Sequence, residues 1–181
     1  MKKFIVAFAC IAVLAAACSS SGADSGTDTG SSTGSSSSIS EAGSTAKGST
    51  PDSMTELAMS KITPQGELLK LSEQTVKNFY TLPENTRYSI YVSSVFTADE
   101  LAVLELKDGR DELVEAAKAR LTALKNSLKD YKPDVYTTVD ENAGIYTVGD
   151  SVILISGSAE NVSAAKSALA EAYGEELKSA E

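Results

Sequence analysis

Two adjacent carboxylates, Asp99 and Glu100, are the side chains in this sequence best suited to acid–base chemistry. A pair of carboxyl groups can act as general acid and general base when the surroundings raise the pKa of one of them. Asp99 and Glu100 would then belong to a small carboxylate-dependent hydrolase. The alternative is a polar turn between two strands. A deep pocket containing both carboxylates would favour the hydrolase, and a flat surface would favour the turn.

A possible nucleophile pattern is Ser163-Ala164-Ala165-Lys166, which matches the Ser-x-x-Lys pair of penicillin-binding enzymes. Those enzymes also need Ser-Asp-Asn and Lys-Thr-Gly elements, and the sequence contains neither. We therefore expect Ser163 and Lys166 to lie on the solvated face of a helix.

Two acidic stretches match metal sites only in part. Asp140, Glu141 and Asn142 are spaced like the start of a calcium loop, but Ile145 and Ser151 stand where that loop requires Gly and Glu. The other stretch lies near the start of a predicted helix, where negative charge favours the helix dipole without a ligand; it consists of Asp108, Asp111, Glu112 and Glu115. We expect no metal site and no cofactor.

The composition excludes several classes of chemistry. The chain of 181 residues contains no His, and its two cysteines are Cys10 and Cys18. Once a signal peptide is removed, no zinc site of the Cys/His type, no cysteine nucleophile, no Ser-His-Asp triad and no disulfide scaffold can form in the folded part. The net charge of −9 repels phosphate backbones, so nucleic-acid binding is not expected. We predict no catalytic residue and no enzymatic activity.

The N-terminus has the pattern of an export signal. Lys2 and Lys3 precede 14 uncharged residues, 4–17, which as a helix would span roughly 21 Å and are too short to cross a membrane. They fit the apolar region of a signal peptide. The run ends in Leu14-Ala15-Ala16-Ala17-Cys18, which resembles a bacterial lipobox. Its Leu is one place further from the cysteine than usual. The alternative is an ordinary secretion signal.

This resemblance implies that residues 1–17 are removed and that Cys18 becomes an acylated N-terminus. Two acyl chains hold a protein stably at a bilayer, whereas one gives only marginal binding. We therefore expect a lipid anchor at Cys18 and a location on the extracytoplasmic face of the cell membrane.

A polar tract follows the cysteine. Residues 19–52 contain 13 Ser, 6 Gly and 5 Thr among 34 residues, and Ile39 is their one large apolar residue. Such a composition cannot bury a core and behaves as a flexible coil. We predict three parts: the signal peptide 1–17, the acylated Cys18 with a disordered tether (18–52), and a single domain (53–181).

Hydrophobic periodicity predicts an α+β domain. Apolar residues at steps of three and four indicate helices over 111–130 and 159–173, and shorter helices over 54–60 and 72–80, the latter capped by Ser72. β-branched and aromatic residues indicate strands over 88–96, 101–107, 145–148 and 151–156, with a further short strand over 135–139. The main elements follow the order α-β-β-α-β-β-α.

This order predicts a sheet of about four mainly antiparallel strands. Helices 111–130 and 159–173 are expected on one face. The strands 101–107 and 151–156 are apolar on both faces, and monomers seldom leave such a patch in water. The N-terminal helical segment 66–82 is expected to cover the other face; a partner protein or a second copy of the domain is the alternative.

One candidate contact patch lies on the first strand. Tyr88 and Tyr91 are three residues apart, so they should face opposite sides of the sheet. An exposed Tyr91 beside Ser89 and Ser93 would form a small binding surface.

Four stretches resemble an uncharacterised domain family whose members are mostly short lipoproteins of Gram-positive anaerobic bacteria. They are residues 98–109, the helix containing Lys118 to Leu121, Asp130-Tyr131-Lys132-Pro133, and residues 149–157. The resemblance covers about residues 66–173. It implies this fold and the lipid anchor, and it assigns no activity, ligand or catalytic residue.

Together these features predict a membrane-anchored lipoprotein whose domain is a non-catalytic binding or accessory module at the cell envelope, with an unidentified envelope protein or ligand as its partner. The alternatives are the carboxylate-dependent hydrolase and an assembly module that uses an apolar sheet face.

Overall fold

The computed structural model describes residues 49–94 and 97–180, so the predicted signal peptide, Cys18 and most of the predicted tether lie outside the described residues. The described chain forms one six-stranded antiparallel sheet with the strand order β1-β2-β3-β5-β4-β6. Its strands are β1 (Leu68–Lys70), β2 (Arg87–Ser93), β3 (Glu100–Glu105), β4 (Gly144–Val148), β5 (Ser151–Ser156) and β6 (Lys178–Ser179). The α+β class and the antiparallel sheet predicted from the sequence are confirmed.

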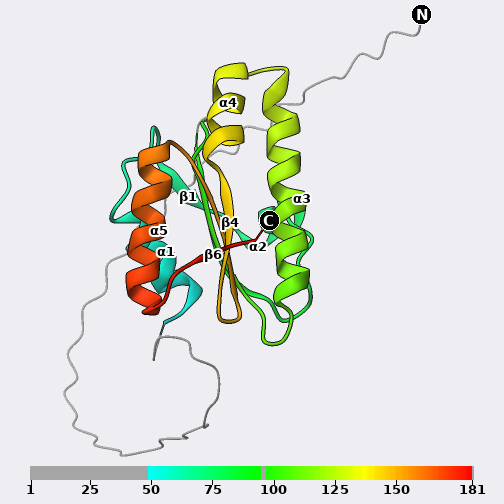
Figure 1. Cartoon of the computed structure of the whole chain (residues 1–181). Helices are drawn as coiled ribbons and strands as arrows, with labels where there is room; N and C mark the ends of the chain where they lie inside the picture. The colour runs from blue at the N-terminus through cyan, green and yellow to red at the C-terminus, as the bar shows by residue number, and fades with distance from the viewer. Residues whose placement is uncertain (1–48, 95–96, 181) are drawn as a thin grey trace, which may run out of the picture. The chain divides into compact units, whose positions relative to one another are not determined.

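Five helices pack around this sheet (Figure 1). They are α1 (Pro51–Met59), α2 (Glu73–Phe79), α3 (Arg110–Lys129), α4 (Pro133–Asn142) and α5 (Ala159–Tyr173). Their ends follow local chemistry. The side chains of Ser72 and Ser158 accept hydrogen bonds from the first turns of α2 and α5, and Gly174 ends α5 in the left-handed conformation at φ +70°.

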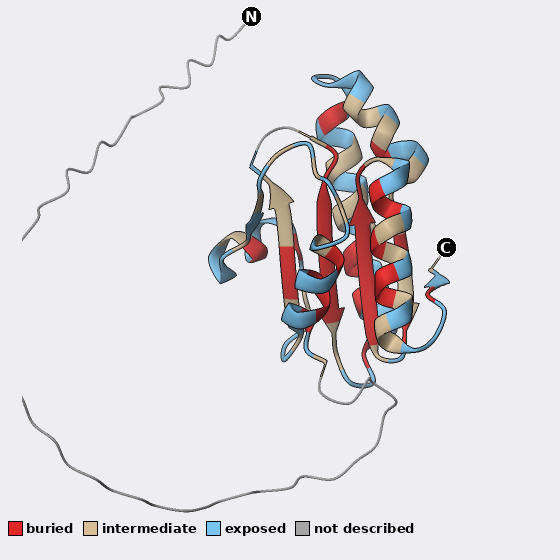
Figure 2. Ribbon diagram, turned by 90° about the vertical axis from the view of Figure 1, so that its left-hand side faces the viewer, coloured by how far each residue is buried: buried red, intermediate tan, exposed pale blue. Residues whose placement is uncertain are grey.

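Both faces of the central strands are covered by helices of the same chain. On β3 and β5, residues such as Leu101 and Ile153 pack with α1 and α5. Their neighbours Ala102 and Leu154 pack with α2 and α3. The result is a three-layer domain in which β5 is buried throughout and β3 is buried except at its last residue, Glu105 (Figure 2).

Two predicted placements are wrong. Helices 111–130 and 159–173 do not share a face, because α3 and α5 lie on opposite sides of the sheet. Segment 66–82 does not cover the face opposite α3: it contains β1, which extends the sheet, and α2, which packs on the same side as α3. The sheet face opposite α3 is covered by α5 together with α1.

The assembly hypothesis relied on a free apolar sheet face, and in the described chain neither face of the central strands is free.

The strand predicted over 135–139 is also wrong, since these residues belong to α4. Pro133 opens the helix at a position where its missing N–H is not needed. Val135 and Val139 are four residues apart on one helical face, and they pack with Leu128 of α3 and with Ala98. This packing outweighs the strand preference of a run rich in Val, Thr and Tyr.

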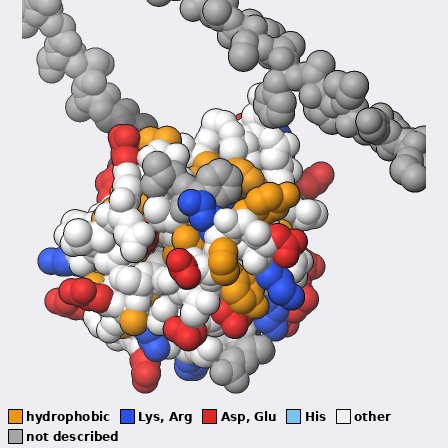
Figure 3. Space-filling model, turned by 90° about the horizontal axis from the view of Figure 1, so that it is seen from above, with side chains coloured by type: hydrophobic (Ala, Val, Ile, Leu, Met, Phe, Trp, Pro, Cys, Tyr) orange, Lys and Arg blue, Asp and Glu red, His pale blue; other side chains and the backbone are white. Residues whose placement is uncertain are grey.

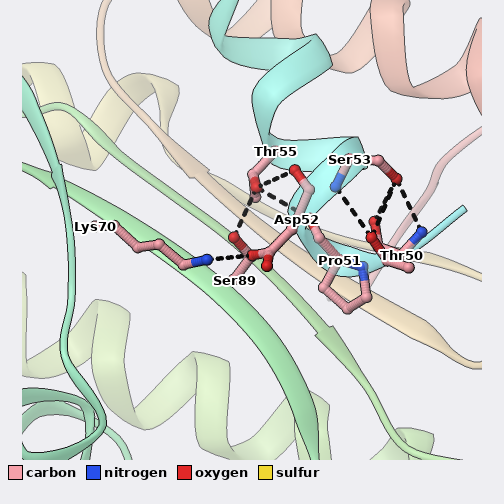
Figure 4. A network of polar contacts seen from close by, with 7 residues as sticks. All are labelled: Thr50, Pro51, Asp52, Ser53, Thr55, Lys70 and Ser89. Atoms are coloured by element: carbon pink, nitrogen blue, oxygen red, sulfur yellow. Dashed lines mark hydrogen bonds and ion pairs between the residues drawn. The ribbon is translucent and has the colours of Figure 1, made fainter. Parts of the chain in front are cut away.

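Helix α1 begins at Pro51, two residues before the predicted domain boundary, so its first two residues belong to the segment predicted as tether. Figure 4 shows the contacts that hold its first turn. Thr50 accepts a hydrogen bond from the Ser53 backbone N–H at 3.2 Å, and the Ser53 hydroxyl accepts one from the Thr50 N–H at 2.9 Å. Farther along, the Thr55 and Ser89 hydroxyls are 2.7 Å apart, which joins α1 to β2.

The Thr50→Ala substitution is expected to lower the free energy of unfolding by about 0.5–2 kcal/mol, because it leaves an N–H group of the first turn of α1 without its acceptor. Thr50→Ser keeps the hydroxyl and should cost only a few tenths. Urea denaturation measures both values, and equal losses for the two variants would contradict the capping role.

Candidate functional site

A buried ion pair with a tyrosine joins Glu100, Arg120 and Tyr80. The three side chains come from the first residue of β3, the middle of α3 and the end of α2. Arg120 donates from Nε to both Glu100 oxygens at 2.9 and 3.1 Å and from Nη2 to Oε2 at 2.5 Å. The Tyr80 hydroxyl donates to Glu100 Oε1 at 2.6 Å. The side chains of Glu100 and Arg120 are only 3% and 10% exposed.

The surroundings in this cluster raise the pKa values of two groups, Tyr80 and Arg120. Burial, reinforced by the negative charge of Glu100, raises the pKa of Tyr80 well above its usual value. Burial alone would lower the pKa of Arg120, but the hydrogen bonds and charge of Glu100 outweigh burial and raise it. Phe79 adds a cation–π contact, with its ring centre 4.6 Å from the guanidinium carbon. The raised pKa keeps the Arg120 guanidinium protonated at neutral pH.

A pocket of about 360 Å³ opens beside this ion pair, at the end of the sheet where β2 ends and β3 begins. Its walls are apolar, with Leu124 and Leu128 from α3 facing Val92 and Ala98. Phe79, Glu100 and Arg120 also line it, together with the polar residues Ser94, Thr97 and Ser127. Apolar walls with a few convergent polar groups are typical of small-molecule sites. We call this cavity the Arg120 pocket. Figure 3 views the domain from above, the α4 end near which the pocket lies, and shows hydrophobic side chains among charged ones there.

The proposed carboxylate pair is not formed. Asp99 and Glu100 are consecutive residues whose side chains turn to opposite layers of the domain. Asp99 Oδ1 accepts from Asn161 of α5 at 3.3 Å, whereas Glu100 pairs with Arg120 of α3. The other oxygen of Asp99 accepts from the Gln65 N–H and the Thr97 hydroxyl, each at 3.1 Å. Through the bond from Gln65, Asp99 connects the segment that follows α1 to the start of β3.

The remaining candidate residues make contacts other than the predicted catalytic or metal ones. Lys166 Nζ lies 4.9 Å from the ring centre of Tyr146 rather than beside Ser163, which is exposed. Asp140 belongs to α4 and pairs with Lys125 at 2.9 Å. Within residues 49–94 and 97–180, no three carboxylates come together as a metal site.

The patch proposed around Tyr91 is only partly present. Tyr88 and Tyr91 do face opposite sides, since Tyr88 packs with the α2–α3 layer while Tyr91 shares the parity of Ser89, which contacts α1. Ser89 is fully buried beneath α1, so it cannot contribute to a surface. Ser93 is half-buried and lines the Arg120 pocket.

Arg120 and Tyr80 were not predicted as site residues. A signal for Arg120 was present in the sequence, because it lies three residues after Ala117 and four before Leu124, in line with the apolar stripe of its helix. A charge in that stripe must face the core and requires a buried partner. The sequence did not reveal that the partner is Glu100.

The Tyr80→Phe substitution is expected to destabilise the domain at neutral pH by about 1.5–3 kcal/mol, the usual worth of a hydrogen bond to a charged group. Since the folded pKa of Tyr80 is raised, its contribution is complete below pH about 10 and is lost as the pH rises above that value. The stability difference between the two proteins should therefore shrink above pH 10. Urea denaturation from pH 7 to 11 measures it, and a constant difference would contradict the buried phenol.

In the part of the chain that the structure describes, no helix is long and apolar enough to span a bilayer.

No curated protein and no solved structure is significantly similar to the chain. Residues 61–157 match the family described as Domain of unknown function (DUF4358), and this stretch contains every residue named above as lining the Arg120 pocket. The match spans more than half of the 181 residues, and the chain therefore belongs to this family of domains of unknown function.

Proposed function

We propose that the protein is a lipoprotein of the bacterial cell envelope, anchored through Cys18 to the extracytoplasmic face of the membrane, and that its domain binds a ligand there without chemical turnover. The sequence Leu14-Ala15-Ala16-Ala17-Cys18 and the Ser/Gly-rich tether support the anchor. A tether of 34 residues has a root-mean-square span of roughly 32 Å, which would let the domain search the space near the bilayer.

One observation carries the binding role: the Arg120 pocket is apolar, and the charged groups at its inner wall are already paired with one another. A catalytic carboxylate needs freedom to gain and lose a proton. Glu100 is held by Arg120 and Tyr80, and Asp99 is held by Asn161, Thr97 and Gln65. The arrangement is suited to presenting a fixed binding surface, and it gives the hydrolase alternative no specific support.

Cells that produce the chain and grow with an alkyne-labelled fatty acid test the anchor. We expect label on the wild-type protein and its recovery with membranes. Cys18→Ala should lose the label and be shed or remain unprocessed, whereas Cys10→Ala, the matched control, should behave as the wild type. Fatty acid on Cys18→Ala, or unlabelled wild type in the cytosol with its first methionine, would contradict the proposal.

A further inference from the structure

The charge balance of the Arg120 pocket limits what it can bind. The guanidinium of Arg120 is neutralised by Glu100 through Nε and Nη2, and Nη1 takes no part in these bonds. Because Arg120 lines the pocket, a ligand whose carbonyl oxygen reaches Nη1 could accept a hydrogen bond from it. It would meet a donor whose positive charge is already matched by a carboxylate.

Asp99 also borders the pocket, but its carboxylate is turned toward Asn161 of α5, so Glu100 and Arg120 are the charged groups that face the cavity and their charges cancel. An anion entering the pocket would lose its hydration and meet no uncompensated positive charge. A cation would find both oxygens of Glu100 already engaged, since each accepts a hydrogen bond from Arg120. A neutral ligand avoids both penalties.

We propose that the Arg120 pocket is a site for a small neutral molecule with an apolar ring or short aliphatic body and one carbonyl oxygen directed at Arg120. This inference rests on the binding role proposed above and adds the class of ligand. The apolar body would contact Leu124, Leu128 and Ala98. The volume of about 360 Å³ lies at the lower end of the range for small-molecule sites, which is why we infer a small molecule rather than a protein segment.

Benzamide and benzoate test the proposal, because they share shape and differ in charge. The acylated ¹⁵N-labelled protein is titrated with each in detergent micelles, and amide shifts are followed by NMR. Benzamide should shift the amides of Ala98, Glu100 and Leu124 and bind at least about tenfold more tightly than benzoate, whose charge must be desolvated without compensation.

Two tryptophan variants on α3 locate the binding. Ser127 and Ala119 are both exposed on this helix, but Ser127 lines the Arg120 pocket and Ala119 lines a shallow groove beside Leu82. Ser127→Trp should abolish the benzamide shifts, and Ala119→Trp should leave them unchanged. Glu100→Gln should raise the affinity for benzoate at least to that for benzamide, because Arg120 then carries an unmatched charge.

The possible outcomes separate the two proposals. Benzoate binding to the wild-type pocket as tightly as benzamide would overturn the neutral-ligand inference and leave the pocket as a binding site. Shifts that survive Ser127→Trp, or no shifts with either compound, would overturn both. The anchor is tested independently through Cys18.

Discussion

Arg120→Met is expected to lower the free energy of unfolding by about 3–5 kcal/mol, because it breaks a buried ion pair by removing one partner. The substitution leaves Glu100, only 3% exposed, as a buried carboxylate without its cation. The remaining hydrogen bond from Tyr80 cannot compensate for the lost charge. Chemical denaturation by urea at pH 7 measures the loss.

Arg87→Met is the matched control, since Arg87 also pairs with a glutamate of β3. Its partner is Glu105 at 3.1 Å, but the Arg87 side chain is 56% exposed, so this substitution should cost at most about 1 kcal/mol. The double substitution Glu100→Leu with Arg120→Met should recover much of the stability lost by Arg120→Met alone, because no uncompensated charge remains. A similar loss for Arg87→Met and Arg120→Met would show that the Glu100 pair is not buried as described.

Leu113→Ala and Leu169→Ala are each expected to cost about 2–5 kcal/mol, because both leucines are fully buried and the substitution leaves a cavity. Leu113 belongs to α3 and packs on one side of the sheet, while Leu169 belongs to α5 and packs on the other. Their losses should add to within about 0.5 kcal/mol, as for residues without shared contacts.

This additivity tests the three-layer arrangement. If both helices packed on one face, as the sequence suggested, the two leucines would share neighbours and the double variant would show coupling. The summed cost can exceed the stability of a domain. The wild type, the two single variants and the double variant are therefore compared in a sulfate buffer, which strengthens the burial of apolar surface and keeps the double variant folded. Coupling above about 1 kcal/mol would contradict the placement of α3 and α5.

Local chemistry explains the elements that could be predicted. The stripe from Val114 to Leu128 specified α3 within one residue at each end, and Ser158 with Gly174 marked the two ends of α5. Strands β4 and β5 followed from their short apolar runs and the Gly149-Asp150 turn between them. These features depend on neighbours within a few positions of the chain, which is the range that a sequence pattern reports directly.

The candidate site could be predicted only in fragments. Glu100 was identified as a candidate, but with Asp99 as its partner, because adjacency in the sequence suggested proximity. Adjacent side chains at the start of a strand point to opposite faces, and this alternation sends Asp99 to α5 and Glu100 to α3. The partner of Glu100 lies twenty positions away, on a helix whose rotation about its axis is set by packing.

By itself, the sequence determined the α+β class, the main helices and strands with their caps, the acidic character of the domain and the pattern around Cys18 on which the anchor proposal rests. Tertiary structure alone decided which face each helix covers, the helical state of residues 133–142, the two edge strands and the pairing of Glu100 with Arg120. The physical reason is that an amphipathic helix specifies that one of its sides must be buried, whereas a sheet that is apolar on both faces offers two equivalent places to bury it. Only the competition among all helices for those two faces selects one arrangement.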